Sequence, residues 1–261
     1  MKISKDKLVE RLKTENFPLS SKYDPHLVIE NQMGPNVLWL TEWLCKEMTF
    51  RAGERVLDMG CGKALSSIFL AREFDVNVWA ADLWIKPTEN WQRIRRQNLA
   101  DRVFPVYTEA HALPFAEGFF DSAVSLDSYH YYGTDDLYLA YMLSFLKPGG
   151  TIGIVVPGLM REFDGDVPEY LSRKQPSGSV FWNPAECFSF HTVDWWRRHW
   201  EQTGLVKIKK AETLPDGWNL WLKWAELLDE LGTGFDDEAP ALREDRGRYL
   251  GFIRLVAEKS K

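Results

Sequence analysis

The sequence lacks any run of eighteen apolar residues, the length that a membrane-spanning helix requires. Its first residues, 1–7, are polar and contain no apolar region of the kind that a secretion signal carries. The three cysteines stand at positions 45, 61 and 187, too far apart for a disulfide framework or for metal-ligand spacing. We therefore expect a protein of the reducing cytoplasm that holds no metal and has no membrane partner.

Basic residues are also fewer than acidic residues. The chain has 32 Lys and Arg against 38 Asp and Glu, which gives a net charge of −6, and it contains no long basic run. The densest basic group, Arg93, Arg95 and Arg96, falls on a predicted helix, where a solvated face is the favoured interpretation. Proteins that bind nucleic acids present a basic patch or stripe. We therefore expect a small-molecule partner and no nucleic acid.

Two familiar nucleotide-binding motifs are missing. No phosphate loop of the form GxxxxGKS or GxxxxGKT occurs, and Leu65 stands where a dinucleotide fingerprint needs its third glycine. What the chain does have is a hydrophobic content of 45% in 261 residues. That content suits one large α/β domain with a substantial core.

The stretch that organises the chain begins at the end of a buried strand, 56–58, and continues through Gly60 and Gly62 into a helix pattern. Glycines in such a turn let the backbone approach a ligand closely, and the free N–H groups of the helix start face that ligand. A second strand, 76–81, ends at Asp82, twenty residues after Gly62. A βαβ unit that binds a nucleotide places a carboxylate for the ribose hydroxyls at this position.

The segment Val56-Leu-Asp-Met-Gly-Cys-Gly62 resembles the first motif of class I S-adenosylmethionine-dependent methyltransferases, an acidic residue followed by GxGxG. Ala64 replaces the last glycine, and its small side chain still allows a close approach. The resemblance implies a Rossmann-like fold, S-adenosylmethionine as the cofactor and methyl transfer as the activity. Among the groups of this class, the sequence is most similar to the type 11, ubiquinone-biosynthesis-like group. From the first two motifs the resemblance implies these cofactor-binding residues: Asp58, Gly60, Cys61, Gly62, Asp82 and Leu83.

Two later segments extend the resemblance. After a predicted strand at 103–107, residues 108–115 match the third motif, in which Glu109 accepts a hydrogen bond from the adenine amino group and the Ala110 N–H meets a ring nitrogen. After a predicted strand at 122–126 comes Asp127-Ser-Tyr-His-Tyr-Tyr-Gly133, at the place of the fourth motif. The carboxyl ends of parallel strands border the ligand crevice. An aromatic loop that only packs on the next helix is the alternative for this second group.

The predicted fold is a Rossmann-like α/β sheet of seven strands, mostly parallel with an antiparallel last strand, and with helices on both faces. The remaining strands fall at 151–156, 206–211 and 249–258. We expect one domain with four parts: a helical lid segment at 1–50, a cofactor-binding core at 51–158, a substrate-side insertion and helix at 159–205, and a strand hairpin with an inserted Trp-rich helix at 206–261. Packing is favoured over a cation-binding role for the tryptophans at 195–224.

A sulfonium methyl group is already activated, so the protein has mainly to align an acceptor and exclude water. A general base is needed only if the acceptor arrives protonated. We expect His130 and Asp127 to orient or deprotonate the acceptor, and Asp127 also to touch the cofactor. The resemblance makes the turn at 33–34 a lid contact. The residues expected to shape the substrate pocket are Tyr23, Tyr129, Tyr131 and Tyr132.

Two alternatives to a small-molecule methyltransferase stay open. One is a non-catalytic sensor that binds S-adenosylmethionine or S-adenosylhomocysteine in the same pocket. The other is a lipid-modifying enzyme like the cyclopropane fatty acid synthases, although neither a basic membrane-binding patch nor an acyl-binding motif is evident. The sequence does not name the acceptor atom.

Overall fold

The computed structural model describes residues 3–260, and residues 1, 2 and 261 of the expected terminal segments lie outside the described part. Within it, seven strands form one sheet in the order β3-β2-β1-β4-β5-β7-β6. The strands are β1 (Arg55–Met59), β2 (Asn77–Asp82), β3 (Val103–Tyr107), β4 (Phe120–Leu126), β5 (Leu146–Leu159), β6 (Val206–Thr213) and β7 (Leu250–Lys259). Neighbouring strands from β3 to β5 pair in parallel, and β7 runs antiparallel to both β5 and β6. The predicted fold class is confirmed.

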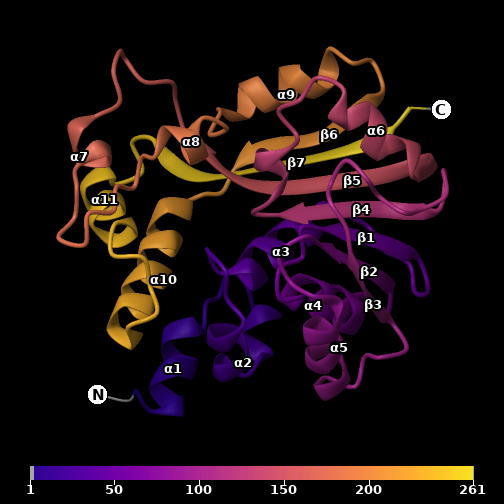
Figure 1. The fold of residues 1–261 in the computed structure, drawn as a ribbon, viewed down its shortest axis with the longest axis horizontal. Coiled ribbons are helices and arrows are strands. Elements are labelled where there is room, and N and C mark those ends of the chain that lie inside the picture. Colours follow the sequence, from indigo (N-terminus) through magenta and orange to yellow (C-terminus); the bar gives the residue numbers. More distant parts are fainter. Residues whose placement is uncertain (1–2, 261) are drawn as a thin grey trace.

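The described helices cover both faces of the sheet and extend beyond one end of it. Their bounds are α1 (Lys5–Leu12), α2 (Pro25–Glu30), α3 (Val37–Cys45), α4 (Leu65–Phe74), α5 (Pro87–Arg96), α6 (Tyr138–Ser144), α7 (Glu169–Ser172), α8 (Pro184–Cys187), α9 (Val193–Glu201), α10 (Gly217–Leu231) and α11 (Glu238–Asp245). Short 3-10 helices lie at Ser20–Lys22 and Tyr129–Tyr131. In Figure 1, α6 and α9 lie on one side of the sheet and α3, α4 and α5 on the other.

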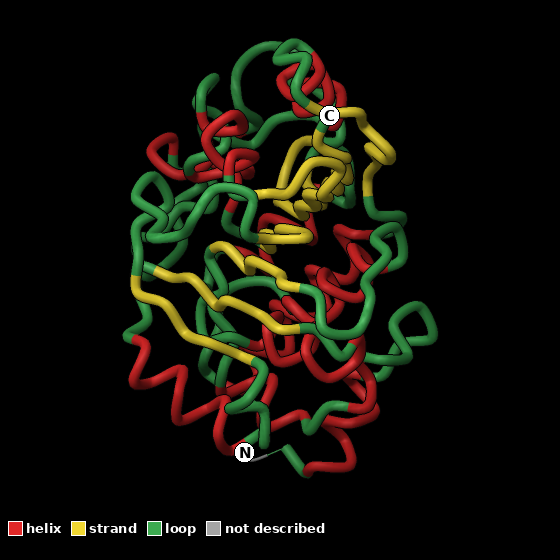
Figure 2. Tube along the Cα trace, turned by 90° about the vertical axis from the view of Figure 1, so that its right-hand side faces the viewer, coloured by secondary structure: helices red, strands yellow, loops and turns green. Residues whose placement is uncertain are grey.

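Alternation along the strands explains the two layers. Successive side chains of a strand point to opposite faces, so each strand contributes to both cores. On β1, Val56 belongs to the core under α3, α4 and α10, whereas Leu57 belongs to the core under α6 and α9. The central strands are buried on both faces, and Figure 2 shows them running through the middle of the molecule. This double burial accounts for apolar residues at successive positions, such as Val56-Leu57 in β1 and Ala123-Val124 in β4.

Segments far apart in the sequence lie side by side, because α1, near the N-terminus, lies next to α10 (Figure 1). Arg11 of α1 pairs with Glu230 of α10 at 3.2 Å. The rings of Trp39 and Trp224 meet edge to face with centroids 6.1 Å apart, and Trp224 Nε1 donates to the Gly34 carbonyl at 2.8 Å. The segment before β1 is thereby held against the helix that lies between β6 and β7.

Two regions hold more helices than the sequence predicts in detail. Within the expected helical segment at 1–50, the described residues form α1, α2 and α3. Between β6 and β7 the structure has α10 and also a second helix, α11, which was not predicted. Trp196, Trp200, Trp221 and Trp224 are buried, so packing in the core is confirmed for these four.

Candidate functional site

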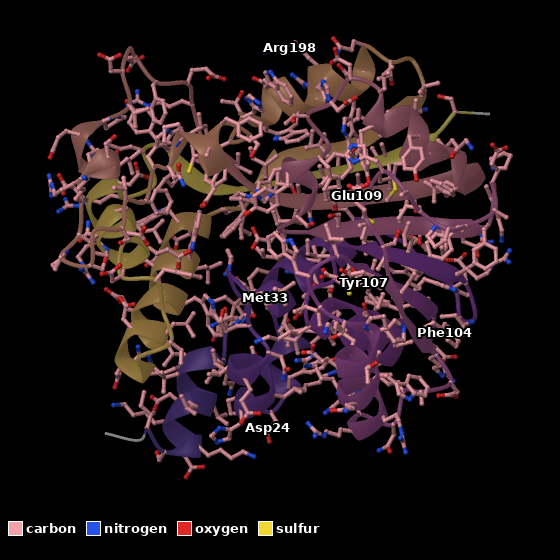
Figure 3. The ribbon with its side chains drawn as sticks, in the orientation of Figure 1. Asp24, Met33, Phe104, Tyr107, Glu109 and Arg198 are labelled. Atoms are coloured by element: carbon pink, nitrogen blue, oxygen red, sulfur yellow. The ribbon has the colours of Figure 1, made fainter. Side chains whose placement is uncertain are left out.

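A cavity of about 320 Å³ opens at the carboxyl ends of the central parallel strands. Two of its lining residues, Met33 and Glu109, are labelled in Figure 3. Residues from five chain segments form its wall. They are Asn31, Met33–Pro35, Val37, Met59–Lys63, Leu65, Asp82–Trp84, Glu109–His111, Leu126–Ser128, Tyr131 and Tyr132.

The turn after β1 presents bare backbone to this cavity. Gly60 and Gly62 have φ angles of +72° and +52°, in the left-handed region that glycine adopts without strain. A Cβ atom on Gly60 would lie 1.9 Å from Ser128 Oγ, and one on Gly62 would lie 2.9 Å from Met33 Sδ. Both positions therefore require glycine, and both lie on the cavity wall together with Cys61.

Asp82 fixes the other side of the turn. Its Oδ2 accepts a hydrogen bond from the Gly62 N–H at 2.8 Å, and its Oδ1 accepts from the Trp84 and Ile85 N–H groups at 2.7 and 2.8 Å. The side chain is 6% exposed and borders the cavity, followed by the exposed Leu83. One carboxylate therefore joins the glycine turn to the loop after β2 and still faces the cavity.

Asp58 lies behind this wall and not on it. Its Oδ2 accepts hydrogen bonds from the hydroxyl groups of Ser66 and Ser67, both at 2.6 Å, and the residue is fully buried. Burial raises the pKa of Asp58 to about 6, against the opposing effect of the two serine hydrogen bonds. The expectation that Asp58 lines the cofactor site is wrong, because the carboxyl group joins the end of β1 to the first turn of α4.

Glu109 and Ala110 line the cavity after β3, as expected from the motif order. The Glu109 carboxylate accepts from the His111 N–H at 2.8 Å and lies 2.9 Å from the His111 ring nitrogen Nδ1. The hydrogen bond from the His111 side chain is the largest effect that lowers the pKa of Glu109. The acidic side chain is therefore ionised and half exposed at the cavity edge.

The loop after β4 supplies the cavity wall with a third carboxyl group, after those of Asp82 and Glu109. Asp127 has a φ of +55°, and burial followed by the nearby charge of Glu238 raises its pKa to about 8. Tyr131 and Tyr132 line the cavity beside it. The hydroxyl group of Tyr132 lies 3.0 Å from Ser125 Oγ and donates to a backbone carbonyl of β1 at 3.3 Å.

Tyr129 and His130 belong to the same loop but point into the protein core. Tyr129 is 0% exposed and packs against Trp196 and Trp200. His130 is 1% exposed, with its ring centroid 4.0 Å from that of Tyr131, and burial lowers its pKa to about 3. Neither lines the cavity, so the expected base role of His130 and the expected pocket role of Tyr129 are wrong.

Tyr23, which we expected to shape the substrate pocket, lies elsewhere in the structure. Its ring stacks on Phe69 with centroids 5.6 Å apart, and its hydroxyl group donates to Glu73 at 3.2 Å. Both partners belong to α4, and Tyr23 does not line the cavity. Through these two contacts, Tyr23 packs the chain before α2 against α4.

The turn at 31–35, which we call the lid segment, contributes Asn31, Met33 and Gly34 to the cavity wall. Two residues that the sequence did not single out as site residues hold it. Arg93 of α5 donates to Asn31 Oδ1 at 2.8 Å and to Asn90 Oδ1 at 3.0 Å, and Asn90 donates to the Gly62 carbonyl at 2.9 Å. The lid segment and the glycine turn therefore share one hydrogen-bond network.

Ser128 and Trp84 complete the wall and were also missed as site residues. Ser128 follows the expected Asp127, and Trp84 follows the expected Leu83, so their adjacency to predicted site residues was the available signal. In residues 3–260 no group of three His, Cys, Asp or Glu has the arrangement of a metal site. No helix in that range combines the length and the apolar character needed to cross a bilayer.

Comparisons with known proteins agree with this geometry. Residues 56–150 match the family model described as a methyltransferase domain. The methyltransferase GfsG of Streptomyces halstedii is 32% identical over 116 residues, which cover 44% of this chain and 42% of GfsG. The match therefore spans less than half of either protein, and it concerns the domain that the two have in common.

Solved structures share the fold over a longer part of the chain. Phosphoethanolamine N-methyltransferase 2 of Haemonchus contortus, in complex with S-adenosyl-L-methionine, matches all of this chain and 61% of its own, at a TM-score of 0.67 and 17% identity. The (4+2)-cyclase SpnF matches 88% of this chain and 84% of its own, at a TM-score of 0.64 and 19% identity. At these identities the likeness concerns the fold alone.

Proposed function

We propose that this chain, whose residues 56–150 match a methyltransferase domain, transfers the methyl group of S-adenosylmethionine to a small molecule. The observation that carries the proposal is the bare glycine turn, which Asp82 joins to the next loop at the edge of the cavity. The match of the domain to a methyltransferase family supports the same conclusion.

The residues present fit this cofactor. The left-handed glycines leave room for its amino acid part next to the start of α4, and Asp82 and Glu109 are acceptors for hydroxyl and amino groups at the ends of β2 and β3. The cavity has acidic side chains that can accept hydrogen bonds from an ammonium group, a ribose and an adenine amino group, and a glycine turn that leaves room beside them.

The chain's own contribution is alignment and exclusion of water. When bound, the cofactor supplies an activated methyl group. The lid segment and Tyr131 both line the cavity, and Asp127 borders it after β4. Rate enhancement then rests on holding an acceptor in line with the methyl group. His130 takes no proton in this scheme, since it is buried away from the cavity.

The finer assignments are parts of the same proposal. The order of the four motifs supports the type 11, ubiquinone-biosynthesis-like group within the class I enzymes. The cysteines at 45, 61 and 187 are free thiols, which supports the expected reducing, cytoplasmic compartment. The remaining expectations, a small-molecule partner and no nucleic acid, follow from the cavity and from the net charge of −6.

The test uses S-adenosylmethionine that carries a trideuterated methyl group. The protein is incubated with this cofactor and a metabolite extract, and the extract is then searched by mass spectrometry for molecules that gained a trideuteromethyl group. We expect at least one labelled product with wild-type protein and much less of it with Asp82→Ala.

Two results would redirect the proposal. Cofactor binding with no labelled product in any extract would favour a sensor over an enzyme. A labelled acyl chain would favour the lipid-modifying alternative, and an absence of cofactor binding would refute the proposal altogether.

A further inference from the structure

The end of the cavity at Asp127 combines a carboxyl group with aromatic surface. Asp127 lies there with Trp84 and Tyr131, whose ring centroids are 6.3 Å apart. Tyr131 is 50% exposed and Trp84 is 71% exposed, so both rings are available to a bound molecule. A carboxylate beside accessible aromatic faces is the combination that recognises organic cations.

The Asp127 carboxylate has no hydrogen-bond donor of its own. Within residues 3–260 it makes no hydrogen bond, although its Oδ2 would lie 2.6 Å from a Cβ atom on Gly34. A carboxyl group that lines a cavity without a donor is free to pair with a ligand that supplies a hydrogen-bond donor or a positive charge. The residue also holds a left-handed backbone conformation, which is common at functional sites.

A second group of unpartnered polar atoms lies on the elements next to this end. Gln32 Oε1, Trp221 Nε1 and Glu238 Oε2 are buried without a hydrogen-bond partner in the described part of the chain. Trp221 is only 4% exposed, and it lies close enough to Glu238 to favour the ionised carboxyl group. The charge of Glu238 in turn acts on Asp127. Within residues 3–260, no Lys or Arg is among the groups that shift the pKa values of Asp127 and Glu238.

The surrounding charges have the same sign. Asp229 and Asp237 act on Glu238, and Glu186 acts with Asp127 on Tyr131. Each of these charges would add to the attraction that a cation experiences at low local dielectric.

An anionic acceptor would find little here to bind it. Lys63 is the one Lys or Arg among the described residues that line the cavity. Its ammonium group donates to the backbone carbonyls of Glu30 and Gln32 at 3.2 and 3.4 Å, so it is already engaged. Carboxylates and phosphates in proteins are usually held by paired Arg or Lys groups.

We propose that the end of the cavity bordered by Asp127, Tyr131 and Trp84 binds a small amine that is cationic at neutral pH. This inference rests on the proposed methyl transfer and names the class of its acceptor, whose ammonium N–H proton passes to the ionised Asp127 carboxylate so that the neutral nitrogen can take the methyl group. The rings of Trp84 and Tyr131 contact the apolar substituents of the amine. The Asp127 carboxylate pairs with the positive charge of the amine or accepts a hydrogen bond from its N–H group. The charge of Glu238, which lies behind the cavity wall, adds to the electrostatic attraction.

The test is isothermal titration calorimetry on protein saturated with S-adenosylhomocysteine, which cannot donate a methyl group. The probes are choline, its uncharged isostere 3,3-dimethylbutan-1-ol, and butyrate. We expect choline to bind about tenfold or more tightly than the isostere, and butyrate not to bind. Asp127→Asn, which keeps a side chain that tolerates the left-handed backbone, should weaken choline about tenfold.

Two further variants test the weaker contribution of Glu238 and provide a control for the loss of a charge. Glu238→Gln should weaken choline by a smaller factor, because Glu238 acts from behind the cavity wall. Asp101→Asn removes an exposed charge elsewhere and should leave choline affinity unchanged. Equal binding of choline and its isostere, tighter binding of butyrate, or wild-type choline affinity in Asp127→Asn would each overturn the inference.

The same titrations separate this inference from the proposed function. If S-adenosylhomocysteine binds and choline shows no preference, the amine class is wrong and methyl transfer stands. If S-adenosylhomocysteine does not bind, the proposed function fails, and the inference fails with it.

Discussion

The ionisation of Asp127 at the cavity lowers the stability of the folded protein. Burial and the charge of Glu238 raise its pKa to about 8, so the folded protein favours the neutral form. A carboxyl group whose pKa is higher in the folded than in the unfolded state supports stability below the unfolded value, near 4. This support is lost as the pH rises through 8. Glu238 and Asp58, with pKa values of about 7 and 6, act in the same direction.

We predict that Asp127→Asn stabilises the protein at pH 8.5 by about 1–3 kcal/mol and much less at pH 5. Asn cannot ionise, so the variant avoids the cost that the wild type acquires as the pH rises. Urea denaturation at the two pH values measures the difference. Asp101→Asn is the control, and an equal change at both pH values in Asp127→Asn would contradict the account.

Residue positions at strand ends could be predicted, whereas the direction of loop side chains could not. Asp82 and Asp127 end or follow parallel strands, and the topology of the sheet then brings them to one edge. Tyr129 and His130 lie in a 3-10 turn, and packing against α9 and the insertion decides which of its side chains face inward. The sequence does not encode that packing locally.

At the scale of elements, the turn between β1 and α4 depends on the loop after β4. A Cβ atom on Gly60 would overlap Ser128, at 1.9 Å from its Oγ and 2.4 Å from its Cβ. A substitution at Gly60 therefore disturbs the packing of two loops in addition to cofactor binding.

We predict that Gly60→Ala destabilises the protein by about 1–3 kcal/mol, because it adds a clash to a left-handed backbone conformation. Ser128→Gly should recover part of this loss in the double variant, since it removes the overlapping side chain. A double-mutant cycle by chemical denaturation measures the coupling. Additive effects of the two substitutions would show that the two loops do not meet as described.

The lid segment depends on α5 in a comparable way. We predict that Arg93→Gln weakens S-adenosylhomocysteine binding by roughly three- to tenfold, because a charge-assisted hydrogen bond to Asn31 is lost. Faster amide hydrogen exchange at residues 31–35 should accompany the weaker binding. The matched control is Arg96→Gln at an exposed position of the same helix. Unchanged exchange in the lid segment of Arg93→Gln would contradict the role of this network.

Regular elements were the most predictable part of the chain. Strand β3 has the predicted bounds, and the other strands lie within a few residues of theirs except at the ends of β5. Helix α11 was missed because its apolar pattern is short and stabilised by packing on α10.

At the scale of the whole molecule, segments far apart in the sequence meet at the lid segment. The lid segment comes from before β1 and lines the cavity with the glycine turn and Asp82 of the core. Trp224 of α10, a helix between β6 and β7, joins that helix to the lid segment through its hydrogen bond to Gly34. The domain match covers 56–150, so the lid segment and α10 both lie outside it.

The central claim is that S-adenosylmethionine binds in this cavity through the glycine turn and Asp82. Isothermal titration calorimetry with wild type, Asp82→Ala and the exposed control Asp101→Ala tests it most directly. We predict measurable binding to wild type and to the control, and a loss of about 1.5–3 kcal/mol in Asp82→Ala, with thermal denaturation confirming that the variant is folded. Wild-type affinity in a folded Asp82→Ala variant, or no binding to the wild-type protein, would contradict the account.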